Sequence, residues 1–254
     1  MSSKAGLSRA NAPFSALVHH ENALETGIVH LGLGNFHRAH LAIYTAKAVA
    51  ASGGPWGIFT YSFRSKTLSD ALIHQDYLYS VIDFAPNTEA VSIPAIHTGA
   101  AAGLDHVDQV ITQIAHASTK IISITVTEAG YSISQKTNGL DRDSADIQAD
   151  LAGGAPKTLV GLLVRGLQAR LKSNALPITI MSCDNLTSNG DRTRKQLSEF
   201  IDALPKSESV QLIEYLNNSV TFPNSMVDRI VPGTEERHLL LAEERLGVHD
   251  AIPV

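Results

Sequence analysis

One stretch decides the fold of this chain: Ile28-Val29-His30-Leu31-Gly32-Leu33-Gly34-Asn35-Phe36-His37-Arg38-Ala39-His40. A short apolar run rich in β-branched residues leads into two glycines and then into a segment with helical periodicity. This is the order that a dinucleotide-binding strand-to-helix turn needs. Gly32 allows a tight turn, and Gly34 lets the backbone approach a pyrophosphate without a Cβ in the way. His37 stands where the general fingerprint has its third glycine, so a plain strand-to-helix turn stays open as the alternative.

The helix that follows the glycines points its unpaired N–H groups and its positive dipole end toward bound phosphate groups. Arg38 lies in the first turn of this helix, where its side chain either reaches a phosphate or is solvated at the surface. The predicted cofactor contacts in this stretch are Gly32, Gly34, Asn35, Phe36, His37 and Arg38.

Strands and helices alternate along the rest of the chain. The expected strands are 28–33, 57–63, 77–84, 121–126 and 178–181, and the expected helices are 36–51, 68–72, 107–114, one opened by Pro156, 197–204 and shorter ones around Ile213 and Leu239. Residues 138–154 are polar and are expected to form a loop or insertion. The nearly unbroken apolar run 121–126 is typical of a strand buried on both faces of a parallel sheet. The alternation predicts an α/β fold with a doubly wound, mostly parallel sheet.

The glycine stretch closely resembles the start of the mannitol dehydrogenase family, which includes mannitol 2-dehydrogenases and fructuronate reductases. Three later stretches occur in the family's order and at about its spacing: Thr125-Val126-Thr127-Glu128-Ala129-Gly130-Tyr131, Met181-Ser182-Cys183-Asp184-Asn185-Leu186 and Phe222-Pro223-Asn224-Ser225-Met226-Val227-Asp228-Arg229-Ile230. The resemblance runs from about Gly27 to the last residue and implies a Rossmann-type domain that binds NAD or NADP. We therefore expect residues 1–26 to form an N-terminal arm and residues 27–254 to form this domain.

In doubly wound sheets the ligand lies beyond the carboxyl ends of the strands. The glycine stretch, the segment from Thr127 to Tyr131 and the segment from Ser182 to Asn189 all follow expected strands. Thr127 and Asn185 are therefore predicted to contact the cofactor as well.

The end of the second strand bears on the choice of cofactor. An acidic residue there would accept hydrogen bonds from the adenosine ribose, but the chain has Arg64-Ser65-Lys66. Two cations beside a serine favour a 2′-phosphate and hence NADP, unless they are solvent-facing loop charges. The resemblance implies NAD, because family members with a similar arginine-serine stretch are expected to use it. We place NAD first and leave NADP open, with Arg64 as a predicted cofactor contact.

Composition excludes several classes of partner. The chain has 254 residues, 44% of them hydrophobic, and a net charge of −5, which argues against a nucleic-acid or anionic-membrane surface. Its single cysteine, Cys183, excludes an internal disulfide and fits a reducing compartment. The N-terminus lacks the layout of a signal peptide, and no apolar run approaches about 18 residues. We expect a cytoplasmic protein.

The eleven histidines do not predict a metal site. His37 and His40 are three residues apart on a helix, and His19 and His20 are adjacent, but no cysteine or carboxylate cluster completes a ligand set. The resemblance also implies a metal-independent mechanism.

The resemblance implies that a lysine of a helical C-terminal domain is the general acid/base and that asparagine side chains polarise the carbonyl. Asn185 occupies the position of one such asparagine, and an amide donates to an alkoxide without titrating. The alternative is a loop asparagine bonded to its own backbone. Asp228 is predicted to contact a substrate hydroxyl, or else it pairs with Arg229.

The lysine string of the family has no counterpart here, since no lysine follows Lys206. We therefore expect the chain to be the nucleotide-binding part of an oxidoreductase that interconverts a polyol such as mannitol with its ketose. Fructuronate reduction is an alternative, and so is a non-catalytic nucleotide-binding module. The expected partners are a polyol or sugar acid and a C-terminal catalytic domain or chain.

Overall fold

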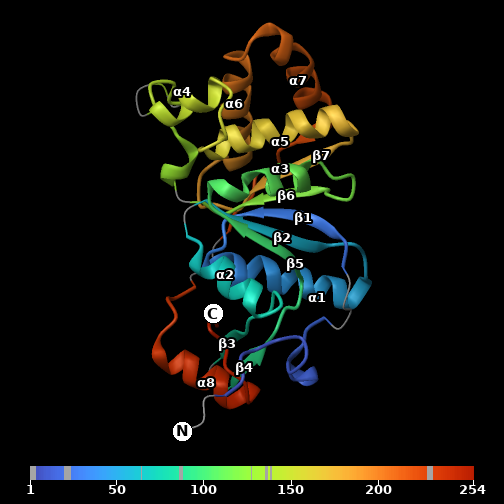
Figure 1. The fold of residues 1–254 in the computed structure, drawn as a ribbon, viewed down its shortest axis with the longest axis vertical. Helices are drawn as coiled ribbons and strands as arrows, with labels where there is room; N and C mark the ends of the chain where they lie inside the picture. Colours follow the sequence, from blue (N-terminus) through green and yellow to red (C-terminus); the bar gives the residue numbers. More distant parts are fainter. Residues whose placement is uncertain are drawn as a thin grey trace.

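A parallel sheet of six strands forms the centre of the molecule (Figure 1). The computed structural model describes residues 4–19, 24–63, 65–85, 88–126, 128–134, 137, 139–227 and 231–254. The strand order is β5-β2-β1-β6-β7-β8, and every neighbouring pair is parallel. The strands are β1 (Thr26–Leu31), β2 (Gly57–Ser62), β5 (His97–Ala102), β6 (Ile121–Ile124), β7 (Ile178–Ser182) and β8 (Val220–Thr221). This order is that of a Rossmann sheet, and the predicted doubly wound α/β fold is confirmed.

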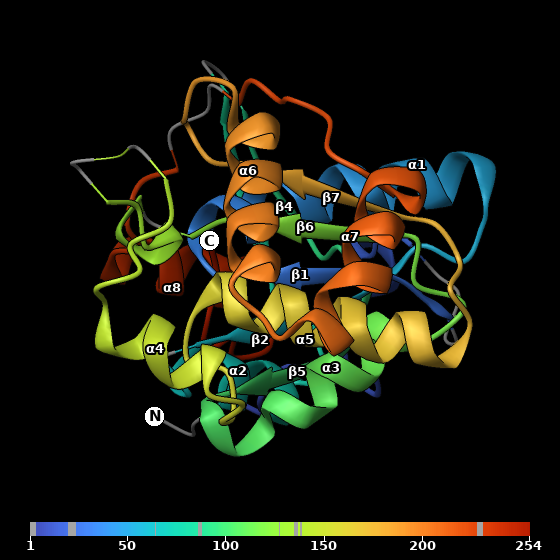
Figure 2. The same cartoon turned by 90° about the horizontal axis from the view of Figure 1, so that it is seen from above.

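Helices cover both faces of this sheet. In Figure 1, α3 (Val107–Ala115) and α5 (Leu159–Ser173) lie above the strands, and α1 (Ala42–Ser52) and α2 (Thr67–His74) lie below them. Helices α6 (Asn189–Asp202) and α7 (Lys206–Ser219) pack against α5 and against each other, and Figure 2 shows them from above.

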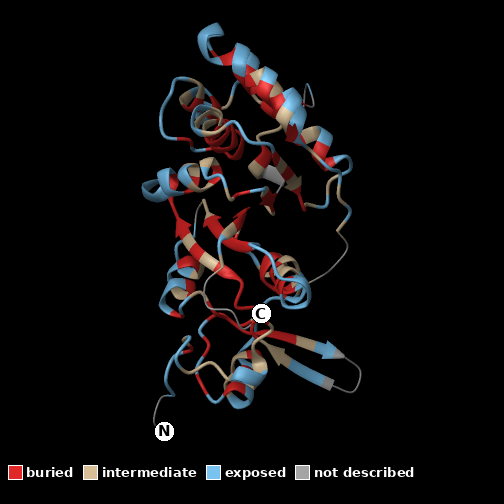
Figure 3. Ribbon diagram, turned by 90° about the vertical axis from the view of Figure 1, so that its right-hand side faces the viewer, coloured by how far each residue is buried: buried red, intermediate tan, exposed pale blue. Residues whose placement is uncertain are grey.

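The strand β1 separates two apolar cores because successive side chains of a strand point to opposite faces. Val29 and Leu31 face the core under α3 and α5, and Ile28 faces the core over α1. Figure 3 shows the buried residues concentrated in the strands and on the inner sides of the helices. His30 points to the α1 side and is completely buried, so a polar ring lies directly beneath the glycine stretch.

A smaller unit lies at the end of the molecule that carries both termini (Figure 1). The antiparallel hairpin of β3 (Val81–Ala85) and β4 (Thr88–Ser92) meets α8 (Glu236–Leu246) there. Residues 4–19 pack on this unit, with Leu7 in a third apolar cluster and its N–H bonded to the carbonyl of His249 at 2.8 Å. The division of the chain at residue 26 stays a prediction.

Several element predictions were wrong in detail. The helix expected over 197–204 is α6, which begins at Asn189, and the strand expected over 77–84 is β3, which begins at Val81. The expected loop at 138–154 contains α4 (Ala145–Leu151), which has one large buried aliphatic residue, Ile147, and so no visible period. Helix α5 begins at Leu159, because the Thr158 hydroxyl caps it by accepting the Gly161 N–H at 3.0 Å. The helix around Ile213 is as long as α6. Strand β5 was not predicted, because Thr98 is the single residue of its sequence His-Thr-Gly-Ala-Ala-Ala that favours strands.

Within the described ranges no helix combines the length and the apolar character that crossing a membrane requires.

Candidate functional site

Gly32 follows β1 in a conformation that favours glycine. Its φ is +118°, and a Cβ built on it would lie 2.0 Å from the carbonyl oxygen of Thr125, which directly follows β6. The Gly32 N–H donates to the Tyr61 carbonyl at 2.8 Å, and the Thr125 N–H donates to the Leu31 carbonyl at 2.9 Å. The first glycine is therefore required by the close approach of the two central strands, whichever ligand the loop binds.

Gly34 is surrounded by open space. A Cβ built on it would meet no heavy atom within 4 Å, and the residue is exposed. The chain becomes helical from residue 35, passes through a π-helical turn over His37–Leu41 and continues as α1. The helix N-terminus and the open face of Gly34 lie between β1 and β6, where the strand order reverses. This combination suits the pyrophosphate of a dinucleotide.

The Arg38 side chain points into the protein and is 2% exposed. Its Nη1 donates to the carbonyl of Ile252, and its Nη2 donates to Asn35 Oδ1 at 2.6 Å. The Asn35 amide in turn donates to the carbonyl of Pro232 at 3.2 Å. A direct contact between Arg38 and a phosphate over the loop would require the guanidinium to leave these partners.

His37 is also directed inward and joins a buried cluster of three histidines. Its ring stacks on that of His30 with centroids 3.6 Å apart, and its Nε2 lies 2.9 Å from Nε2 of His97. His30 bonds to the hydroxyls of Ser123 and Thr125 at 2.8 and 2.9 Å. The cluster thus joins β1, β5, β6 and the helical turn beneath the glycine loop.

The three imidazoles are uncharged at neutral pH. Burial lowers the pKa of His30 and that of His97 to about 3, and the charge of Arg38 lowers that of His97 further. Burial, the adjoining rings of His30 and His97 and the charge of Arg38 hold the pKa of His37 well below its ordinary value. His37 therefore brings no positive charge to the loop above it, and its contribution there is packing.

A second polar cluster lies beyond β6 and β7. The Tyr131 hydroxyl donates to Asp184 Oδ2 at 2.5 Å and lies 2.7 Å from the hydroxyl of Ser182. Burial raises the pKa of Asp184 to about 6, although the Tyr131 hydrogen bond works in the opposite direction. Burial also raises the pKa of Tyr131. This pair joins the segment after β6 to the segment that carries Asn185.

Asn185 lies in the exposed bend that follows β7. The bend is held by the buried Asn189, whose amide donates to the carbonyls of Ser182 and Asp184 at 3.2 and 3.0 Å and to the Ser225 hydroxyl at 3.0 Å. Within the described part of the chain, no hydrogen bond occupies the Asn185 amide. Its donors are therefore available to a ligand.

The glycine loop and Asn185 lie at the same edge of the sheet. Leu31 is in register with Ile124, and Ile124 is in register with Ser182, so both loops leave the sheet at one level. Two strand spacings separate β1 from β7, which corresponds to about 10 Å. The structure brings these two parts of the predicted site together on either side of β6.

The remaining predicted site residues are Phe36, Arg64, Thr127 and Asp228. Phe36 is partly exposed and its ring stacks on that of His40 with centroids 4.8 Å apart. Arg64, Thr127 and Asp228 lie outside the described residues. Lys66 is exposed and its Nζ lies 2.5 Å from Asp105 Oδ2.

Histidine, cysteine and acidic side chains do not assemble into a metal-binding group of three anywhere in the described ranges.

Sequence reasoning missed four residues of these clusters: His30, His97, Tyr131 and Asp184. Tyr131 and Asp184 stand inside the family strings, and that position is the signal that pointed to their neighbourhood. Their hydrogen bond joins residues 53 positions apart, which no local pattern reveals. His97 lies on the strand that was not predicted, so nothing in the sequence connected it with His37.

Comparison with known proteins also identifies a Rossmann domain. The model of the mannitol dehydrogenase Rossmann domain matches residues 26–254. A mannitol 2-dehydrogenase of Aspergillus fumigatus is 38% identical over 240 residues, which are 91% of this chain and 47% of that protein. The uncharacterized oxidoreductase YeiQ of Escherichia coli is 34% identical over 244 residues, which are 92% of this chain and 49% of that protein.

Two solved structures share the fold. The mannitol 2-dehydrogenase of Pseudomonas fluorescens, in a ternary complex with NAD and D-mannitol, aligns with a TM-score of 0.87 and 32% identity over 98% of this chain and 52% of that one. A substrate-free D-sorbitol dehydrogenase aligns with a TM-score of 0.86 and 28% identity over the same shares. The chain thus spans about half the length of the proteins that it matches.

Proposed function

Since the chain belongs to the mannitol dehydrogenase family, whose Rossmann-domain model matches residues 26–254, we propose that it binds NAD and serves as the nucleotide-binding half of a polyol dehydrogenase. The observation that carries this proposal is the open face of Gly34 at the point where the strand order reverses. A ligand backbone can approach the main chain there, and the N-terminus of the following helix offers N–H groups to its phosphates.

The backbone of the Gly32–Phe36 loop would hold the pyrophosphate. Gly34 leaves room for it, and the N–H groups of Asn35 and Phe36 stand at the start of the helix. His37 and Arg38 would support this loop from inside the protein, where their side chains lie. Thr127, directly after Val126, is proposed to contact the cofactor at the end of β6.

NAD rather than NADP is supported by the surroundings of Lys66. Its ammonium group pairs with Asp105 at 2.5 Å, so most of its charge is compensated before any 2′-phosphate arrives. The similar structure from Pseudomonas fluorescens was solved with NAD. NADP is the alternative, and it would rely on Arg64 together with a Lys66 that had left Asp105.

Asn185 is proposed to stabilise the reacting oxygen. The cofactor would supply the hydride acceptor for the alcohol as NAD and the hydride donor for the ketone as NADH. The amide of Asn185 can donate a hydrogen bond to the alkoxide that develops there, without changing its own charge. The proton would go to a general base on a C-terminal half, as the family resemblance implies. Asp228 is proposed to contact a substrate hydroxyl.

Mannitol and fructose are the proposed substrate pair, because several relatives carry the name mannitol 2-dehydrogenase. Mannonate and fructuronate are the alternative. A nucleotide-binding module without turnover of its own is a second candidate function, favoured by the fact that the chain spans about half of its relatives. In both cases we expect the protein to work in the cytoplasm.

Calorimetric titration with NADH tests the proposal. Gly34→Val should abolish binding, because a branched side chain would fill the space that the pyrophosphate needs. Ala51→Val is the control, because it adds the same branched side chain at an exposed position near the end of α1. Equal affinity of wild type and Gly34→Val would remove the site from Gly34, and a wild-type chain that binds no NADH would overturn the proposed function.

A further inference from the structure

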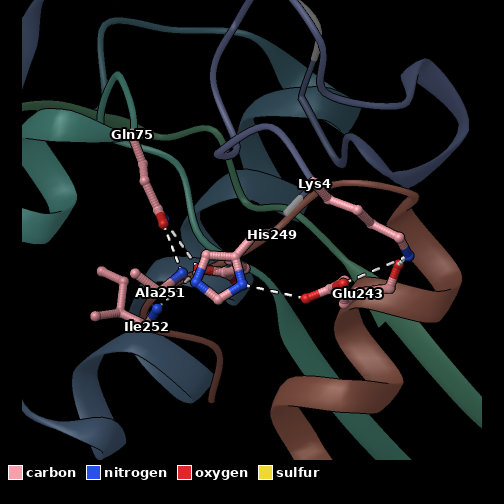
Figure 4. Close-up of polar contacts among 7 residues, drawn as sticks. Lys4, Gln75, Glu243, His249, Ala251 and Ile252 are labelled. Carbon is pink, nitrogen blue, oxygen red and sulfur yellow. Dashed lines mark hydrogen bonds and ion pairs between the residues drawn. The ribbon is translucent and has the colours of Figure 1, made fainter. Parts of the chain in front are cut away.

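The last six residues of the chain, 249–254, are built into the fold. The Val254 N–H donates to the carbonyl of Ser80 at 3.0 Å, and the Ile82 N–H donates to the carbonyl of Val254 at 2.7 Å. The Ala251 N–H donates to Gln75 Oε1 at 2.7 Å, and Figure 4 shows this contact. This C-terminal segment, residues 249–254, is therefore seated on the stretch between α2 and β3.

Asp250 is the anchor of the C-terminal segment. It is 1% exposed, and its Oδ2 accepts both the N–H and the hydroxyl of Ser80 at 2.6 Å. Its Oδ1 accepts the Gln75 amide and the Ile252 N–H, each at 2.9 Å. A buried carboxylate with four donors resists displacement, because any shift leaves a charge without partners in a medium of low dielectric.

The guanidinium of Arg38 connects the C-terminal segment to the glycine loop. It donates to the carbonyl of Ile252, two residues after Asp250. Burial lowers its pKa, and Tyr79 and the charge of Asp250 act in the opposite direction. A buried guanidinium of this kind depends on its hydrogen-bond acceptors, and the carbonyl of Ile252 is one of two that the side chain has.

The other acceptor lies in the glycine loop. Arg38 Nη2 donates to Asn35 Oδ1 at 2.6 Å, and Asn35 directly follows Gly34. The Asn35 amide also donates to the carbonyl of Pro232, so both ends of the amide are held. The planar fork of one arginine thus bridges the C-terminal segment and the residue that begins the helix at the proposed pyrophosphate site.

We propose that Arg38 is a positioning residue. Its guanidinium bonds both to the C-terminal segment, which Asp250 anchors to Ser80, and to Asn35. The position of the C-terminal segment thereby determines the position of Asn35 and the affinity of the glycine loop for the cofactor. This proposal rests on the proposed function only in taking NAD as the ligand of the loop. In this proposal Arg38 supports the glycine loop from inside the protein and does not contact a phosphate directly. A change that unseats residues 249–254 would weaken cofactor binding without touching the cofactor.

Arg38→Lys tests the fork itself. A lysine keeps the positive charge but has a single ammonium group, which does not reproduce the planar bridge between the Ile252 carbonyl and Asn35. We expect NADH affinity to fall by about tenfold, the effect of losing one hydrogen bond to a charged group. A phosphate-binding residue would show instead a loss that shrinks when salt is raised.

Asp250→Asn tests the coupling, because Asp250 touches Ser80, Gln75 and Ile252 and no residue of the glycine loop. We expect NADH affinity to fall by a similar factor, and the double variant Arg38→Lys, Asp250→Asn to be about as weak as either single variant. Asp150→Asn is the matched control. Asp150 is also 1% exposed and accepts the N–H and the hydroxyl of Thr158 at 3.0 and 2.6 Å, but it lies on α4 and, within the described ranges, has no hydrogen bond to the C-terminal segment or to the glycine loop.

Hydrogen exchange followed by mass spectrometry gives a readout that a general loss of stability would not produce. In Asp250→Asn the peptide covering residues 32–40 should exchange faster, whereas a peptide from α5 should exchange as in wild type. Ser80→Ala is the milder variant if Asp250→Asn does not fold, because it removes only the hydroxyl donor. Its effect on NADH affinity should be about twofold to threefold.

The outcomes separate this proposal from the proposed function. Unchanged NADH affinity in the variant that folds, strictly additive effects in the double variant, or equal acceleration of exchange throughout the chain would each overturn the positioning role. A wild-type chain that binds no NADH would overturn the proposed function alone. The exchange of residues 32–40 in Asp250→Asn would then still decide whether the C-terminal segment positions the glycine loop.

Discussion

The imidazole rings of His30 and His37 lie parallel to within 12°, with centroids 3.6 Å apart. His30 belongs to the central strand, and His37 belongs to the turn that follows the glycine loop. His97 meets His37 edge-on at an interplanar angle of 79°, with the two Nε2 atoms 2.9 Å apart. The floor of the proposed cofactor loop is therefore an uncharged imidazole cluster.

Acid should destabilise the protein through this cluster. The pKa values of His30 and His97 are about 3 in the folded chain against 6.5 ordinarily, so the unfolded chain takes up these protons first. The free energy of unfolding should fall from about pH 6.5 downward, by at most about 1.4 kcal/mol per pH unit for each proton. The free energy of unfolding can be measured with urea at several pH values from roughly 7.5 to 5. Plotted against pH, it should have a shallower slope for His97→Gln than for wild type. The exposed His116→Gln serves as the control, and equal slopes for wild type and His97→Gln would contradict the assignment.

The two glycines should differ in their contribution to stability. Gly32→Ala would place a Cβ 2.0 Å from the Thr125 carbonyl at a φ of +118°. We expect it to lower the free energy of unfolding by about 2–4 kcal/mol. Gly34→Ala meets open space and should leave stability within about 0.5 kcal/mol of wild type. Denaturant titration of both variants measures the difference, and similar values for the two would show that the strand approach is not the constraint on Gly32.

Tyr131→Phe should raise the pKa of Asp184 above its value of about 6. The tyrosine hydroxyl donates to the carboxylate and so favours the charged form, and its removal leaves burial opposed only by the hydrogen bonds from the Val126 backbone and the Ser182 side chain. Titration of the Asp184 side-chain carboxyl carbon by NMR measures the shift. Tyr215→Phe is a matched control, because that hydroxyl donates to the carbonyl of Leu176 in another part of the fold. A pKa that stays the same or falls would mean that the hydrogen bond does not stabilise the carboxylate.

Asp105→Asn should increase the affinity for NADPH. Lys66 would lose its carboxylate partner at 2.5 Å and become available to a 2′-phosphate, while NADH, which lacks that phosphate, should bind as before. The gain should be a few-fold at low salt and should shrink as salt is added, because both groups are exposed. Asp108→Asn on α3 is the control. If NADH and NADPH gain alike, Lys66 does not lie near the 2′ position.

Asn185→Ala should impair catalysis more than cofactor binding. The test joins this chain, fused or in trans, to a lysine-bearing C-terminal half of the family, since residues 1–254 alone should turn over little polyol or ketose. In that assembly the variant should lower kcat by roughly 10²–10³-fold, the range for losing one oxyanion donor, with NADH affinity near that of wild type. Asn217→Ala on α7 is the control. A normal kcat in Asn185→Ala would remove the asparagine from the reaction.

Much of the architecture was predictable because it depends on local patterns. The run from Ile28 to Leu31, the two glycines and the apolar run at 121–124 determine two central strands and the turn between strand and helix. The strings around Tyr131 and Asn185 follow predicted strands, and parallel strands bring their carboxyl ends to one edge. The alternation of side chains along a strand and the conformational freedom of glycine depend on a few neighbouring residues, so both can be predicted from the sequence alone.

The directions of the side chains around the loop were decided only by the tertiary structure. Arg38 has the helical position of a phosphate-binding residue, yet its fork meets a carbonyl 214 residues away. His37 found its partner 60 residues away, on a strand whose alanines gave no signal. A buried charge or imidazole is oriented by whichever polar groups the whole fold brings within reach. The partners of Arg38 and His37 are therefore determined by contacts between distant segments, which no local pattern in the sequence contains.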